Sequence, residues 1–108
     1  MSSDKMDRYS QSMESSREPR KLILFVVGDE PNSRIARLNL DKLSRVSDTA
    51  FEYEIIDVLE DYRAALKHEV MATPALVQVS PANTVLGNLN DTARVLSALG
   101  MQQREHST

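Results

Sequence analysis

Carboxylates and histidines are the first side chains in this sequence that could do chemistry. Asp57, Glu60 and Asp61 lie close together, and such a cluster of oxygen donors could bind a hard cation. The simpler interpretation is that Asp57 ends a strand and the other two begin a helix, where the helix dipole favours negative charge. His68 falls on the polar face of that helix and His106 near the chain end, and neither has a partner at metal-site spacing. We therefore expect no metal and no other cofactor.

The turn at residues 28–33, GDEPNS, is the second place where chemistry could occur. It joins an expected strand to an expected helix, and such junctions can bind phosphate. It lacks the repeated glycines and the lysine of a P-loop, and also the G-x-G-x-x-G spacing. Asp29 and Glu30 would repel a phosphate group. The sequence thus argues against nucleotide binding.

Thiol chemistry is excluded by composition. The 108 residues include no cysteine, so disulfides, thiolate catalysis and cysteine-based zinc sites are impossible. A formal net charge of −3 gives no electrostatic case for nucleic acid or an anionic membrane. Apolar runs are too short to cross a bilayer, and residues 1–19 lack the apolar core of a signal peptide. We expect a cytoplasmic, non-enzymatic protein that binds neither nucleic acid nor membrane.

Hydrophobic periodicity predicts the elements that position these residues. The apolar run at 20–27 and the alternation at 51–58 are typical of strands, and 31–46 has helical spacing. Pro31 suits the first turn of that helix. Its apolar face should consist of Ala36, Leu40 and Leu43, widened by Ile35, Leu38 and Val46.

The second half of the chain predicts a helix, a hairpin and a last helix. Residues 59–72 form a short amphipathic helix with Tyr62, Leu66 and Val70 on its apolar face. Strands follow at 75–79 and 84–87, joined by the loop SPAN. The last helix, 92–100, is capped by Asn90 or Asp91.

Domain limits follow from composition. Residues 1–19 hold six serines and no Leu, Ile, Val or Phe, so we expect a disordered N-terminal tail. Residues 20–101 should form the folded domain and residues 102–108 a polar C-terminal tail.

The predicted order, β-α-β-α-β-β-α, is that of an α/β protein with a thioredoxin-like fold. In that fold a cis proline precedes the third strand, and the Thr73–Pro74 bond is expected to be cis here. A redox enzyme of this fold would carry a nucleophilic thiolate after the first strand, which this sequence lacks. The sequence therefore favours binding over catalysis.

Four motifs in order extend this interpretation to a family. The segments LILFVVGDEPNS, YEIIDVLED, VMATPALVQVSP and VLGNL, over about residues 22–100, resemble the KaiB family of circadian clock proteins. The thioredoxin-like sensor domain of the SasA kinase is similar too. The resemblance implies a protein that binds a KaiC-type ATPase ring and modulates its phosphorylation or output signalling. KaiA-like or SasA-like clock proteins are further partners that it implies.

The resemblance also implies particular residues and states. The partner-binding residues would be Asp57, Val58, Leu59, Glu60, Asp61, Tyr62 and Ala65, together with positions one or two helical turns further on. Proteins of this family switch folds. Their thioredoxin-like state is implied to be a monomer, and a ground state of order β-α-β-β-α-α-β a possible tetramer. The switching region would include Gly87, Asn88 and Asn90.

Departures from the family pattern leave alternatives open. Asn88 stands where Asp is usual, Tyr62 where proline is common, and the loop at 80–84 is short with one proline. The alternative function is a SasA-like adaptor in stress or kinase signalling without a clock role. A glutathione-transferase-like enzyme would need a second helical domain, for which the length leaves no room. Strand alternation at 75–79 and the capped helix at 92–100 favour the thioredoxin-like order as the resting state.

Overall fold

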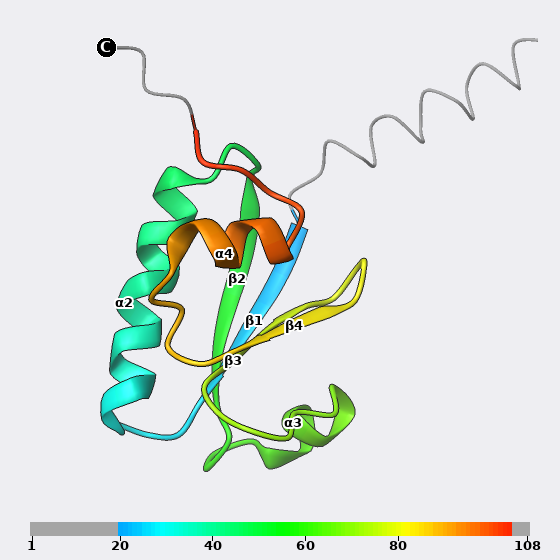
Figure 1. Ribbon diagram of the computed structural model, residues 1–108. Coiled ribbons are helices and arrows are strands. Elements are labelled where there is room, and N and C mark those ends of the chain that lie inside the picture. Colours follow the sequence, from blue (N-terminus) through cyan, green and yellow to red (C-terminus); the bar gives the residue numbers. More distant parts are fainter. Residues whose placement is uncertain (1–19, 105–108) are drawn as a thin grey trace, which may run out of the picture.

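Seven elements follow the predicted order in the computed structural model, which describes residues 20–104 (Figure 1). They are β1 (Arg20–Val26), α2 (Pro31–Val46), β2 (Phe51–Asp57), α3 (Tyr62–Lys67), β3 (Ala75–Gln78), β4 (Asn83–Leu86) and α4 (Thr92–Ala98). The thioredoxin-like fold class is confirmed, and the alternative order β-α-β-β-α-α-β does not describe residues 20–104. The predictions for residues 1–19 and 105–108 lie outside the described residues.

The four strands form one sheet in the order β2-β1-β3-β4. Strands β1 and β2 are parallel and joined through α2, whereas β3 pairs antiparallel with both β1 and β4. In this register Leu24 of β1 lies opposite Ile55 of β2 and Leu76 of β3. The central strand β1 is therefore paired on both sides, and β2 and β4 form the two edges of the sheet.

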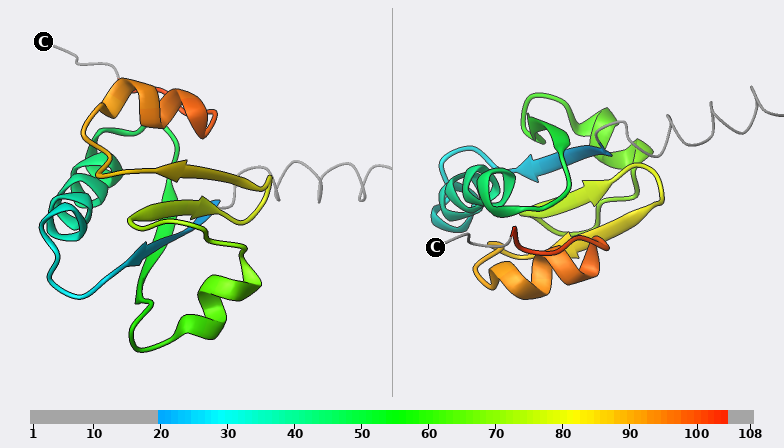
Figure 2. Two further views of the ribbon diagram at one scale, coloured as in Figure 1. Left: turned by 60° about the horizontal axis from the view of Figure 1, so that its bottom comes forward. Right: turned by 90° about the horizontal axis from the view of Figure 1, so that it is seen from above.

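Helices α2 and α4 cover one face of the sheet, and α3 lies on the other (Figure 2). Side chains alternate between the two faces of a strand, so Leu22 and Leu24 of β1 point to the first face, and Ile23 and Phe25 to the second. The larger core comprises Leu22, Leu24, Val26, Ala36, Leu40, Leu43, Leu76, Leu89, Val95, Leu96, Leu99 and Met101. The smaller core, under α3, comprises Ile23, Phe25, Ala65 and Val77.

Helix α2 begins and ends at the predicted residues, and its core face is narrower than predicted. Pro31 opens the helix, and Ala36, Leu40 and Leu43 are buried as expected. The prediction was wrong for Ile35 and Leu38, which are exposed. At 100° per residue these two positions lie on the flank and the outer side of the buried line, so the sheet does not reach them.

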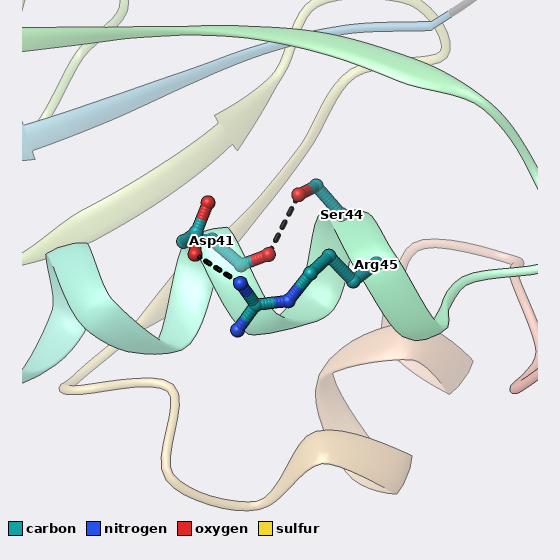
Figure 3. A network of polar contacts seen from close by, with 3 residues as sticks. All are labelled: Asp41, Ser44 and Arg45. Atoms are coloured by element: carbon teal, nitrogen blue, oxygen red, sulfur yellow. Dashed lines mark hydrogen bonds and ion pairs between the residues drawn. The ribbon is translucent and has the colours of Figure 1, made fainter.

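The outer side of α2 carries an exposed ion pair between Asp41 and Arg45 (Figure 3). The guanidinium of Arg45 lies 2.9 Å from the Asp41 carboxylate. The Ser44 hydroxyl donates a hydrogen bond of 2.6 Å to the Asp41 carbonyl oxygen. These contacts are all within one helix, so they add local order without joining α2 to another element.

The C-terminal end of the described chain is hydrogen-bonded to the loop after α2. The Asp48 N–H donates to the Gln102 carbonyl at 2.7 Å, and the Arg104 N–H donates to the Val46 carbonyl at 2.6 Å. Residues 102–104, expected to belong to a tail, thus lie against the end of α2. Among residues 20–104, no helix is both long and apolar enough to span a membrane.

Candidate partner-binding site at helix α3

Helix α3 is shorter than predicted because it is bounded by specific backbone contacts. Asp61 caps its start, since the carboxylate accepts a hydrogen bond of 3.1 Å from the Ala64 N–H. Its end is marked by Glu69, whose φ is +56°, a left-handed conformation that does not continue a helix. The helix therefore covers residues 62–67 rather than the predicted 59–72.

Helix α3 turns its small residues to the sheet and its large ones to solvent. Ala65 is buried and packs with Phe25 in the smaller core. Tyr62 and Leu66 are 61% and 68% exposed. They lie one turn apart on the outer side of the helix. The predicted apolar face was therefore wrong for Tyr62 and Leu66, and small side chains allow the close approach of helix and sheet instead.

Two further predictions concern residues that follow α3, and one of them changes with this orientation. Val70 is half-buried and packs against the smaller core, as its predicted face requires. His68 was expected on the polar face, but it is half-buried with its ring centroid 5.9 Å from that of Phe25. It therefore lies against the smaller core rather than in open solvent.

The turn before α3 is organised by Asp57. Its carboxylate accepts hydrogen bonds from the Gly28 N–H at 3.2 Å and from the Leu59 N–H at 2.9 Å. Its carbonyl oxygen accepts from the N–H groups of Glu60 and Asp61, both at 2.9 Å. The Oδ1 atom of Asp57 thus fixes the turn. Together with the cap formed by Asp61, these contacts give two of the three acidic residues a structural role.

Val58 anchors the turn to the sheet. It is half-buried, packs against the smaller core, and donates its N–H to the Val26 carbonyl at 2.9 Å. Among residues 20–104, no group of three or more His, Cys, Asp or Glu side chains could hold a metal ion.

Four large apolar side chains remain exposed around this turn and helix. We call them the α3 surface: Leu59, Tyr62, Leu66 and Met71. Met71, in the loop between α3 and β3, is 91% exposed, the highest value among the exposed large hydrophobic residues of the described chain. Such a group of exposed apolar side chains is typical of a surface that binds a partner.

The seven predicted partner-binding residues divide between exposed and supporting positions. Leu59, Glu60, Asp61 and Tyr62 are exposed. Asp57 and Val58 are half-buried supports, and Ala65 is buried under the helix, where it offers little area to a partner. Leu66 and Met71 were not among the partner-binding residues that were predicted by number. The one-turn spacing between Tyr62 and Leu66 was the signal that could have identified Leu66.

The residues that the family resemblance links to fold switching lie in the loop between β4 and α4. Gly87 has a φ of +102°, and its N–H donates to the Pro74 carbonyl at 2.9 Å. The Asn88 carboxamide oxygen accepts from the Asn90 N–H at 3.1 Å. Pro74 is buried, Thr73 is half-buried, and the bond between them is cis. The loop and the Thr73–Pro74 turn are therefore neighbours, whereas the switching role stays a prediction.

Comparison with known proteins identifies the family. The KaiB domain family model matches residues 23–101, which include α3 and both flanking loops. The circadian clock oscillator protein KaiB of Acaryochloris marina (strain MBIC 11017) is 35% identical over 101 residues, covering 88% of this chain and 94% of that protein. The KaiB proteins of Synechococcus sp. (strain RCC307) and Prochlorococcus marinus (strain MIT 9303) are also 35% identical. Each covers 82% of this chain, over 86% and 80% of its own length, respectively. These matches and the fold show that the chain belongs to the KaiB family.

Proposed function

We propose that this chain is a non-catalytic clock protein that binds a KaiC-type ATPase ring through the α3 surface. By binding, it modulates the phosphorylation of the ring or its output signalling. Its similarity to proteins named circadian clock oscillator proteins supports the clock role. We infer from such a partner that the protein acts in the cytoplasm.

The exposure of the α3 surface is the observation that carries the proposal. Four large side chains contribute apolar area to solvent: Leu59, Tyr62, Leu66 and Met71. The first three lie on a turn and helix whose backbone is already fixed by Asp57 and Asp61. Burying apolar area is worth about 25 cal/mol per Å². Because the turn and helix are formed beforehand, little further ordering is needed when a partner covers them.

The charges beside the α3 surface suit the rim of a protein interface. Glu60, Arg63 and Lys67 are exposed and carry both signs of charge. Interfaces commonly have an apolar centre and a polar rim, and the rim charges act mainly on orientation and association rate. The α3 surface therefore fits a protein partner better than a small molecule.

The SasA-like adaptor remains a second candidate because of how α4 is built. Asp91 caps α4, with its carboxylate accepting from the Arg94 N–H at 3.2 Å, and Leu96 and Leu99 are buried in the larger core. These contacts favour a permanently thioredoxin-like protein. An adaptor would bind its partner without changing the phosphorylation rhythm of a KaiC-type ring, whereas a clock protein would shift that rhythm. Adding the purified chain to a cycling ring separates the two functions.

The binding proposal is tested with two matched leucine variants. Leu66→Ala removes an apolar contact from α3, and Leu38→Ala removes a leucine of similar exposure, 73% against 68%, from α2. Affinity for a purified KaiC-type ring with ATP is measured by biolayer interferometry. Leu66→Ala should bind about tenfold more weakly, the loss of a moderate interface contact. Leu38→Ala should bind like the wild type.

Two results would count against the proposed surface. Equal losses of affinity in both variants would indicate that truncating any exposed leucine weakens binding, wherever it lies in the fold. Unchanged binding by Leu66→Ala would move the contact away from α3. Circular dichroism of each variant checks that its helices remain.

A further inference from the structure

Met71 and Met101 are the two methionines among residues 20–104, and their surroundings are opposite. Met71 is 91% exposed in the loop after α3. Met101 is 3% exposed in the larger core, where its sulfur accepts a 3.5 Å hydrogen bond from the Ser47 hydroxyl. A water-soluble reagent can therefore reach the Met71 side chain directly, whereas Met101 is protected by packing.

Thioethers are the only sulfur groups in the chain, because it has no cysteine. A peroxide oxidises a thioether by transferring one oxygen atom. The sulfur lone pair attacks a peroxide oxygen, the O–O bond breaks, and an S–O bond forms. With a proton shift, the second oxygen of hydrogen peroxide leaves as water. The sulfur is oxidised by two electrons to the sulfoxide, which dedicated reductases can reverse.

Oxidation at Met71 would change the chemistry of the α3 surface. Leu59 and Leu66 are hydrocarbon side chains and Tyr62 reacts poorly with peroxide, so Met71 is the member that such an oxidant converts. A sulfoxide is polar, and burying its oxygen without a hydrogen-bond donor costs free energy. The same group that adds apolar area to the interface when reduced would oppose burial when oxidised.

We propose that Met71 is a site of reversible oxidation by peroxides, and that its sulfoxide weakens partner binding at the α3 surface. The second part rests on the proposed function. The first part concerns the chain alone and rests on the exposure of Met71 and the burial of Met101.

Peptide mapping after peroxide treatment of the full-length folded protein tests the first part. Trypsin places each of the five methionines in a different peptide, and those of Met71 and Met101 span residues 68–94 and 95–104. The peptide 68–94 should gain an oxygen atom at least about tenfold faster than 95–104, because packing restricts access to the buried thioether. In denaturing urea the two rates should converge. Comparable rates in the folded protein would overturn the inference.

Binding after oxidation tests the second part. The chain alone is treated with peroxide, which is removed before a purified KaiC-type ring is added with ATP. Wild-type affinity should fall about five- to tenfold and recover with methionine sulfoxide reductases. Met71→Leu should keep its affinity after treatment, and Met71→Gln, which mimics the polarity of the sulfoxide, should bind weakly without it.

The outcomes separate the inference from the proposed function. An equal loss in oxidised Met71→Leu would assign the effect to another residue and overturn the inference. Failure of the untreated wild type to bind the ring would overturn the proposed function and the regulatory part with it. Peptide mapping would still decide whether Met71 is the oxidation site.

Discussion

The two faces of the sheet are covered unequally, and the difference separates the face that contributes most to stability from the face that we propose for recognition. Twelve buried residues form the core under α2 and α4, whereas four form the core under α3. The first face is covered by helices of 16 and 7 residues, and the second by one of 6 residues. Most of the buried apolar area therefore lies on the α2 side, and the α3 side is left free to carry exposed apolar side chains.

On the α3 side, where few side chains are buried, local hydrogen bonds stabilise the turn and the helix. Asp57 fixes the turn before the helix and Asp61 caps its first residues, while α2 is held mainly by its buried stripe of Ala36, Leu40 and Leu43. Regions with few buried contacts open at lower free energy than the main core. The comparison thus predicts that α3 opens locally while the rest of the fold stays intact.

The largest effect should come from truncating a leucine in the larger core. Leu40 is fully buried on α2, and Leu40→Ala should cost about 2–5 kcal/mol of the free energy of unfolding, because it leaves a cavity. Leu66→Ala on the exposed side of α3 should change it by less than about 0.5 kcal/mol. Urea denaturation of both variants measures the contrast.

A large destabilisation by Leu66→Ala would contradict the proposed difference between the two faces of the sheet. It would mean that the α3 surface is covered in the isolated protein, by another copy or by a segment outside residues 20–104. Repeating the measurement at several protein concentrations distinguishes these two possibilities, since only association depends on concentration.

Two helix caps with the same hydrogen-bond pattern should give effects of intermediate size, one on global unfolding and one on local opening. Asp61 and Asp91 each accept from the backbone N–H three residues on, at 3.1 and 3.2 Å. Loss of such a cap costs about 1 kcal/mol. Because α4 packs into the larger core, Asp91→Ala should lower the global free energy of unfolding by that amount.

In Asp61→Ala the cost should instead appear mainly as faster hydrogen exchange of the α3 amides. The global unfolding free energy should change less than in Asp91→Ala, because opening of α3 leaves the larger core closed. Equal global losses in the two variants would show that α3 unfolds only together with the whole domain.

The order of elements could be predicted from sequence because each long element carries its own periodic signal. Pro31 and the spacing of Ala36, Leu40 and Leu43 predicted α2 to the residue. The contact between residues 102–104 and the end of α2 could not be predicted, because it joins positions more than fifty residues apart. Pairing over such a separation depends on the assembled fold rather than on a local pattern.

The orientation of α3 is where sequence reasoning failed. Tyr62, Leu66 and Val70 have the spacing of a buried stripe, and the alternative, burial of Ala65, removes less apolar area from water. The structure buries Ala65 because the short helix approaches the sheet closely over Phe25. Local patterning favours the larger side chains, and only the tertiary geometry shows that they face outward, where they form the candidate site.

The smallest effect should come from the exposed ion pair on the outer side of α2, and it sets the scale for surface changes. Asp41 and Arg45 are 53% and 70% exposed with their charges 2.9 Å apart. The acidic residue precedes the basic one by one turn, the favourable orientation. Water screens the attraction, and holding two long side chains together costs entropy, so a double-mutant cycle with alanine should give a coupling of about 0.3–0.5 kcal/mol. Raising the salt concentration should reduce this coupling further.

A coupling well above about 1 kcal/mol would show that surface contacts also stabilise α2. The contrast between a buried, stabilising face and an exposed face that we propose to bind a partner would then need revision.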